Sequence, residues 1–135
     1  MASSDALPGP RPRPLSPHLR IYRVTMTMAM SLAHRISGAA LYVGVLLLAW
    51  FLIAVSADAS TFAVFSNFTG SFIGRLVLFV FTWALFHHLI GGLRHILWDA
   101  GHGLDAPLRD QMAWATAVGG FALTVVVWIL GLAVR

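Results

Sequence analysis

The chain of 135 residues is 59% hydrophobic and 10% charged. Soluble domains carry about 25% charged residues, so this composition excludes a soluble globular domain and indicates an integral membrane protein. The absence of cysteine excludes disulfides, thiolate nucleophiles and iron–sulfur clusters ligated by this chain. The net charge of +4 is an ordinary result of basic flanks beside a membrane, so we expect lipid and no nucleic acid as a partner.

The first 30 residues are expected to lie outside the membrane core, as a cytoplasmic tail and an interfacial segment. Residues 1–17 contain five of the six prolines and lack the apolar stretch of a signal peptide, so we expect an irregular tail. Residues 18–30 mix arginines with apolar side chains, which is typical of a segment at the membrane surface. Residues 31–135 are expected to form the membrane domain.

Three apolar stretches follow, each close to the about 20 residues that a helix needs to cross a bilayer. The predicted spans cover residues 31–55, 72–98 and 112–134, with a connection over 57–70 and a polar loop over 99–110. The chain is thus predicted to be an all-α integral membrane protein with three transmembrane helices.

The placement of arginines predicts the orientation of these helices. Four arginines precede the first span, and Arg109 lies in the loop between the second and third spans. The connection between the first and second spans has neither Arg nor Lys. The positive-inside rule then puts the N-terminus inside and the C-terminus outside.

The most unusual segment is the stretch 87–95 of the second span, which holds three histidines and an arginine. Ionisable groups at membrane depth are costly, and they usually face a partner, a cofactor or water. Neutral imidazole is a common axial ligand of haem iron, so the segment indicates a buried redox cofactor. The alternative is that these histidines only form hydrogen bonds between helices.

Helical spacing divides the polar side chains of this span into two stripes. At about 100° per residue, His88, His95 and Asp99 share one stripe, and His87 and Arg94 form a second stripe about 100° away.

Two further features of this span support a buried cofactor, namely its small residues and the depth of its histidines in the membrane. The Gly91–Gly92 pair lies between His88 and His95, and small residues let a backbone or a flat ring approach closely. His88 is expected near mid-membrane, about 15 Å along the helix from Trp98, whereas His95 lies nearer the inner surface.

A second polar cluster opens the first span, also at its inner end. Ser31 and Arg35 are four residues apart and share a helical face. A hydroxyl and a fixed cation suit a carbonyl that becomes anionic on reduction. His34 and Arg35 can instead reach an anionic propionate. The alternative interpretation is a helix cap followed by an arginine that extends to the membrane surface.

Three motifs in this order resemble those of the succinate dehydrogenase (complex II) cytochrome b556 subunit family. They are residues 13–22 (RPLSPHLRIY), 31–38 (SLAHRISG) and 88–99 (HLIGGLRHILWD). The resemblance covers nearly all of the chain after the first dozen residues. It implies one of two small membrane subunits that bind haem b and reduce ubiquinone, beside an iron–sulfur subunit and a flavoprotein subunit. The implied location is a bacterial inner membrane or, alternatively, the mitochondrial inner membrane.

The resemblance also implies roles for individual residues. His88 would be the axial ligand of the haem iron, with the other axial ligand from the partner anchor subunit. Ser31 and Arg35 would line the quinone pocket, and His34 and Arg35 would lie near the haem propionates. The neighbouring His87 leaves open which of the two imidazoles ligates.

Other functions stay open at this point. Within the family, the chain could be the anchor of a fumarate reductase that works in reverse. A small proton-coupled transporter would use His88, His95 and Asp99 as a relay. A passive anchor would contact neither haem nor quinone.

Overall fold

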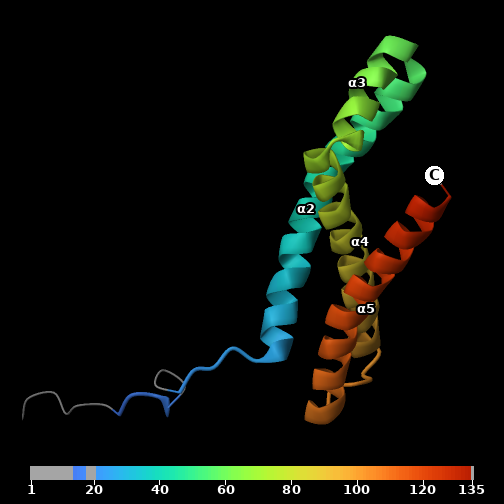
Figure 1. The fold of residues 1–135 in the computed structure, drawn as a ribbon. Helices are drawn as coiled ribbons and strands as arrows, with labels where there is room; N and C mark the ends of the chain where they lie inside the picture. The colour runs from blue at the N-terminus through green and yellow to red at the C-terminus, as the bar shows by residue number, and fades with distance from the viewer. Residues whose placement is uncertain (1–13, 18–20, 135) are drawn as a thin grey trace, which may run out of the picture.

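A computed structural model of the chain describes residues 14–17 and 21–134. Figure 1 shows how the helices within residues 21–134 are arranged. They are α2 (Met26–Ser56), α3 (Ala59–Gly70), α4 (Phe72–Asp99) and α5 (Ala106–Ala133). Three of them, α2, α4 and α5, are long and apolar enough to cross a membrane, which confirms the three predicted spans.

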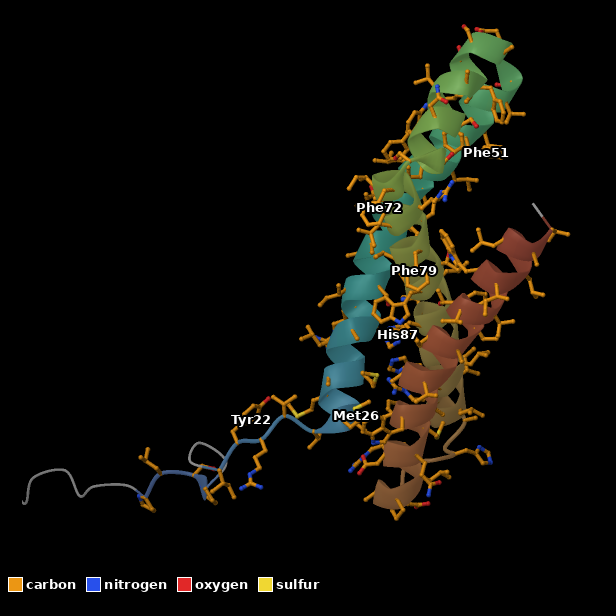
Figure 2. The ribbon with its side chains drawn as sticks, in the orientation of Figure 1. Tyr22, Met26, Phe51, Phe72, Phe79 and His87 are labelled. Carbon is orange, nitrogen blue, oxygen red and sulfur yellow. The ribbon has the colours of Figure 1, made fainter. Side chains whose placement is uncertain are left out.

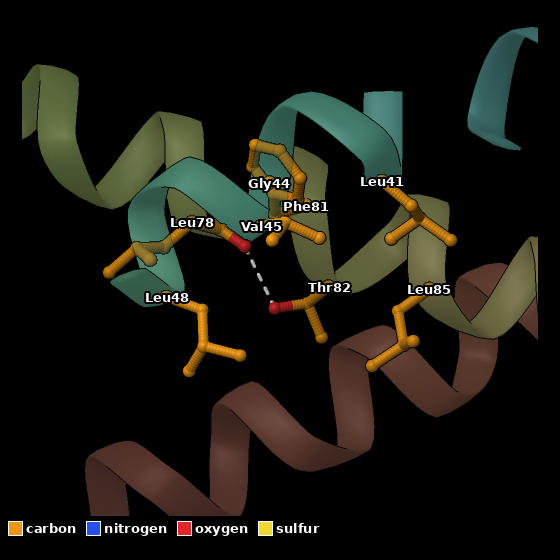
Figure 3. A pocket seen from close by; sticks show the side chains of 8 residues that line it. All are labelled: Leu41, Gly44, Val45, Leu48, Leu78, Phe81, Thr82 and Leu85. Carbon is orange, nitrogen blue, oxygen red and sulfur yellow. Dashed lines mark hydrogen bonds between the residues drawn. The ribbon is translucent and has the colours of Figure 1, made fainter. Parts of the chain in front are cut away.

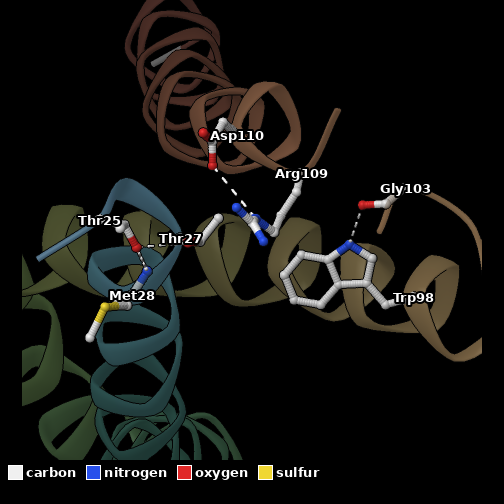
Figure 4. Close-up of polar contacts among 7 residues, drawn as sticks. All are labelled: Thr25, Thr27, Met28, Trp98, Gly103, Arg109 and Asp110. Carbon is white, nitrogen blue, oxygen red and sulfur yellow. Dashed lines mark hydrogen bonds and ion pairs between the residues drawn. The ribbon is translucent and has the colours of Figure 1, made fainter. Parts of the chain in front are cut away.

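Helix α2 begins earlier than the sequence predicts, at Met26 rather than at residue 31. The side chain of Thr25 accepts a hydrogen bond from the amide of Met28 at 3.3 Å, and this cap fixes the start of the helix (Figure 4). Residues 26–30, which we assigned to the interfacial segment, are therefore the first turns of a membrane helix. Residues 18–20 of that segment lie outside the described part of the chain.

Helix α5 also begins earlier than predicted, at Ala106. Pro107 lies in its first turn, where the fixed φ of proline favours the helix and its missing N–H is not needed. The connection that remains, residues 100–105, is closed by Gly103 at a φ of 75°. The indole of Trp98 donates a hydrogen bond of 3.1 Å to the Gly103 carbonyl, which holds this connection against the end of α4 (Figure 4).

Helix α3 was not predicted, because residues 57–70 were expected to be a connection. It folds back along the C-terminal part of α2 (Figure 1). Trp50 of α2 contacts Phe65 and Phe68 of α3, at ring centroid distances of 5.1 and 5.3 Å. The spacing of three between these phenylalanines is helical, and it places both rings on the face that α2 covers.

The carboxylate of Asp58 caps α3. It accepts hydrogen bonds from the amides of Ser60 and Thr61 at 2.8 and 2.9 Å. The Ser60 hydroxyl, together with the backbone and side chain of Thr61, holds the pKa of Asp58 down to about 2. At any pH at which Asp58 is ionised in the unfolded chain, it is therefore also ionised in the folded protein.

We expect Asp58→Ala to speed hydrogen exchange at the amides of Ser60 and Thr61, because the first turn of α3 loses its cap. Asp58→Asn is the matched control, since asparagine caps helices nearly as well. A lowered folded pKa stabilises the cap fully above the unfolded value of about 3.9, and this effect is lost as the pH falls toward 2. Unchanged exchange in Asp58→Ala would contradict the assignment.

Helix α4 lies between α2 and α5 and contacts both (Figure 1). Small residues line these contacts, among them Ala84 and Gly91 of α4 and Ala113 and Gly120 of α5, all of them buried. Small side chains let helix backbones approach closely, and this is how membrane helices commonly pack.

Large apolar side chains point away from the helices, as Figure 2 shows along the whole bundle. Tyr42 is 83% exposed and Phe72 is 80% exposed. A soluble protein would bury such side chains, so their exposure fits helices that are covered by lipid or by other membrane subunits.

An apolar hollow of about 440 Å³ lies between α2 and α4 (Figure 3). Its lining is Leu41, Gly44, Val45, Leu48, Leu78, Phe81, Thr82 and Leu85. The only polar side chain there, Thr82, already donates its hydroxyl hydrogen bond to the Leu78 carbonyl at 2.8 Å. The hollow therefore has no group that would bind a polar substrate.

Candidate functional site

The closest polar contact between α2 and α4 joins His34 and His88. Their rings are stacked, with centroids 4.1 Å apart and planes 10° from parallel. Nδ1 of His88 lies 3.1 Å from the His34 carbonyl oxygen and 3.3 Å from the Ser37 hydroxyl. Nε2 of His34 lies 3.2 Å from the His88 carbonyl oxygen. Each histidine ring is therefore hydrogen-bonded to the backbone carbonyl of the other histidine.

These contacts fix the proton on the His88 ring. A carbonyl oxygen only accepts hydrogen bonds, so Nδ1 of His88 must be the donor toward His34. Nε2 of His88 then has its lone pair available, and it makes no hydrogen bond to any residue that the structure describes. A metal-ligating histidine almost always donates its other ring N–H to a carbonyl or carboxylate in this way.

Two glycines make room for the stacked rings. A Cβ added at Gly38 would lie 2.9 Å from Cε1 of His88, and one added at Gly91 would collide with Cδ2 of His34. Gly91 therefore admits a flat ring, that of His34, while the predicted approach of a haem edge to the small residues of α4 stays a prediction. Gly92 differs, because among the described residues nothing beyond its chain neighbours and its own helix backbone lies within 4 Å of a Cβ built there.

His87 has a different environment from His88. Its side chain is 1% exposed, and its backbone meets Gly120 of α5. Its ring stacks on Trp83 at a centroid distance of 5.2 Å. Neither ring nitrogen has a hydrogen-bond partner within residues 14–17 and 21–134. The predicted division into two stripes is confirmed, since His87 faces α5 and His88 faces α2.

The structure corrects one predicted difference in depth. The sequence predicts His34 near the inner surface and His88 near mid-membrane, but the two rings are stacked and so share one level. The reason is the early start of α2: His34 lies about 12 Å into the helix, rather than in its first turn. His95 also reaches this cluster, with its ring centroid 5.0 Å from that of His34.

Ser31 and Arg35 line a separate hollow of about 400 Å³ where α2 begins. Tyr22 and Met28 also line it, and apolar side chains complete its wall. The predicted shared face of Ser31 and Arg35 is therefore real, and it borders a cavity. His34 and His88 are absent from this lining, so the two predicted groups of residues occupy neighbouring sides of α2.

Ser37 is a residue of the site that sequence reasoning missed. Its side chain is 1% exposed, and its hydroxyl donates to the His34 carbonyl at 2.9 Å. The available signal was its position three residues after His34, on the same side of the helix. Ser37 thus supports the carbonyl to which His88 is bound.

The histidine cluster offers one ligand rather than a complete metal site. Within the described residues, no three His, Cys, Asp or Glu side chains converge as metal ligands. The rings of His34 and His88 are stacked face to face with their centroids 4.1 Å apart, which leaves no space for a haem between them. A haem at this cluster would therefore be held by one of the two histidines and not by both.

Comparison with known proteins now decides the family. The sequence pattern described as "Succinate dehydrogenase/Fumarate reductase transmembrane subunit" matches residues 9–130. The chain belongs to this family.

The family includes subunits of both succinate dehydrogenase and fumarate reductase, and the similar proteins are subunits of succinate dehydrogenase. The chain is 37% identical over 118 residues to the succinate dehydrogenase cytochrome b556 subunit of Paracoccus denitrificans, over 87% of this chain and 91% of that protein. It is 34% identical over 117 residues to the subunit of the same name from Rickettsia felis, and the match covers 87% of this chain and 91% of that protein. It is 36% identical over 115 residues to the mitochondrial succinate dehydrogenase cytochrome b560 subunit of Mus musculus, and the match covers 84% of this chain and 66% of that protein.

The protein is therefore a membrane anchor subunit of succinate dehydrogenase, a succinate:quinone oxidoreductase. The resemblance on the three motifs is confirmed, and the transporter alternative is wrong. This anchor subunit has its histidine cluster between α2 and α4 and its Ser31–Arg35 hollow where α2 begins.

Proposed function

We propose that this anchor subunit binds one face of haem b through Nε2 of His88. The relatives are named as cytochromes b556 and b560. The observation that carries the proposal is the hydrogen bond from Nδ1 of His88 to the His34 carbonyl, which leaves Nε2 available. When bound, haem b supplies one-electron redox chemistry. The open side at Gly92, next to His88 on α4, suits a flat group beside this histidine.

The neighbouring side chains of α2 fit the rest of the proposed haem site. His34 packs on the ring of His88 and fixes its orientation. Arg35 follows in the chain, and its fixed positive charge suits a carboxylate such as a haem propionate. His87 suits the ligand role less well, because it is enclosed between α4 and α5.

The second axial ligand is proposed to come from a second small membrane anchor subunit. No histidine of the described residues faces His88 from the opposite side of a shared metal position. The iron–sulfur and flavoprotein subunits would complete the enzyme. This chain has no cysteine for clusters, so electrons must reach it from another chain.

We expect this subunit, expressed alone in membranes, to bind haem poorly, because one imidazole leaves the iron incompletely ligated. Co-expression of the second anchor subunit should restore a low-spin b-type spectrum. The measurement is haem content per purified anchor subunit, with and without the partner. Stoichiometric low-spin haem in the isolated chain would contradict the shared ligation.

The hollow lined by Ser31 and Arg35 is proposed to be part of the ubiquinone site. Quinone reduction takes up two electrons and two protons. The Ser31 hydroxyl can donate a hydrogen bond to a quinone oxygen, and the Arg35 cation can stabilise the negative charge that develops there. The hollow lies at the end of α2, close to the membrane surface, so protons can reach it from water.

We propose that α2 begins at the inner side of a bacterial cytoplasmic membrane, with the mitochondrial inner membrane as the alternative. The arginine distribution and the bacterial relatives support this orientation and location. The three spans then put the α4–α5 connection inside and the C-terminus outside.

Single-cysteine labelling tests this orientation, because the natural chain has no cysteine. We expect Ser66→Cys in α3 to react with a membrane-impermeant maleimide in intact spheroplasts. His102→Cys in the α4–α5 connection should react only after the membrane is opened. The reverse pattern would invert the proposed topology.

A further inference from the structure

Arg94 is a buried cation without a counter-charge. Its side chain is 3% exposed, and all three of its nitrogens are enclosed without a hydrogen bond to any described residue. Its nearest favourable contact is the Trp98 ring, 4.9 Å from the guanidinium carbon to the ring centroid. Burying an unpaired charge is costly, so a buried arginine normally has an anionic or hydrogen-bonding partner.

The charged and titratable groups around Arg94 do not supply this partner. On α4, His87 lies on the same stripe two turns away, and it carries no negative charge. On α5, Asp110 is paired with Arg109 at 3.7 Å (Figure 4). Thr116 of α5 donates its hydroxyl proton to the Met112 carbonyl at 2.8 Å. The described residues thus leave the positive charge uncompensated.

Arg94 also lines a cavity between α4 and α5. Its volume is about 190 Å³, several times the about 30 Å³ that one water occupies in the liquid. Leu93 and Leu97, which are 54% and 48% exposed, form its rim on α4, and Met112 and Ala115 line it on α5. The surface of the cavity is apolar, and its rim is on the outer surface of the helix pair. The three guanidinium nitrogens of Arg94 are enclosed behind this surface, so the side chain must turn toward the cavity to meet a ligand there.

We propose that Arg94 turns its guanidinium into this cavity and binds the phosphate of an anionic phospholipid, whose acyl chains lie along Leu93 and Leu97. Arginine binds phosphate through two parallel N–H donors. Arg94 lies about 7.5 Å from the end of α4, beside Trp98, and tryptophan is typical of the headgroup level of a bilayer. The apolar rim favours a lipid as the anion. A carboxylate from another protein would bring polar backbone groups against this rim, where they would lose their hydrogen bonds to water.

This lipid site is separate from the proposed haem and quinone sites. Arg94 and His88 lie about 120° apart around α4, and the cavity of Arg94 shares no residue with the hollow of Ser31 and Arg35. The proposal therefore does not depend on haem or quinone binding by this chain.

The test uses the purified complex in nanodiscs of phosphatidylcholine, with or without phosphatidylglycerol. We expect phosphatidylglycerol to raise the thermal midpoint of the wild type by a few degrees, because a ligand that binds the folded state stabilises it. Arg94→Met should lose this shift, and Arg109→Met, the matched control, should keep it. Native mass spectrometry should find one retained phosphatidylglycerol in the wild type and Arg109→Met and none in Arg94→Met.

Three results with Arg94→Met or with free phosphate would overturn the proposal, and a fourth concerns Arg94→Lys. The first is an equal phosphatidylglycerol shift in Arg94→Met and the wild type. The second is the same shift from inorganic phosphate in phosphatidylcholine discs, which would identify a free anion instead of a lipid. The third is loss of a neighbouring subunit from Arg94→Met in both lipids, which would identify a protein carboxylate. If Arg94→Met does not assemble, Arg94→Lys must show a smaller shift than the wild type, and an equal shift would also overturn it.

Discussion

Replacing His88 with alanine is expected to remove the b-type haem spectrum of the purified complex or to perturb it severely. His88 is the histidine whose Nδ1 is held by the His34 carbonyl and whose Nε2 is available to a metal. On the proposed assignment, the haem would lose the ligand that this chain supplies when this imidazole is removed. The measurement is a reduced-minus-oxidised spectrum with haem content normalised to flavin.

His87→Ala is the matched control for this prediction, since it removes the adjacent imidazole. His87 is buried against α5 and has no hydrogen-bond partner among the described residues, so its loss leaves no partner unpaired. We expect its haem spectrum to be largely intact. Normal haem content and potential in His88→Ala would refute the assignment, and the opposite pattern would move the ligand to His87.

Replacing Ser31 or Arg35 with alanine is expected to depress succinate–ubiquinone reductase activity. Loss of one donor at a site of developing negative charge costs about 100- to 1000-fold in oxyanion holes. A quinone spreads its charge over a larger group, so we expect the lower end of this range or less. Succinate oxidation with a soluble dye takes electrons upstream of the quinone, and it should survive in both variants.

Ile36→Ala is a suitable control, because Ile36 follows Arg35 but does not line the hollow. Its two activities should both stay near the wild type. If both activities fell in parallel in Ser31→Ala and Arg35→Ala, these residues would be structural. If neither activity fell, the quinone pocket would lie elsewhere, and a passive anchor would be favoured.

The membrane helices were predictable from the sequence because a bilayer requires long apolar segments. The two stripes of α4 were also predictable, since helical geometry alone separates His87 from His88. The starts of α2 and α5 were missed because local capping and turn residues, Thr25 and Pro107, extend both helices beyond the apolar windows. Helix α3 was missed because its polar residues suggested a connection, while its phenylalanines pack on Trp50.

The histidine cluster was only partly predictable. Each of its residues belongs to a motif that the sequence displays, but stacking of His34 on His88 depends on how α2 and α4 are aligned along their axes. Gly38 and Gly91 permit that alignment, because a Cβ at either position would meet a histidine ring. Such a contact between distant segments has no signature in local spacing, so the common depth of the two rings emerged only from the structure.

The central claim is that this anchor subunit holds a haem in the assembled succinate dehydrogenase. A reduced-minus-oxidised spectrum of the purified wild-type complex, with haem and flavin both quantified, tests it most directly. The proposed function predicts a low-spin b-type haem in a one-to-one ratio with flavin. A complex that contains all its subunits and reduces ubiquinone at full rate without haem would contradict it.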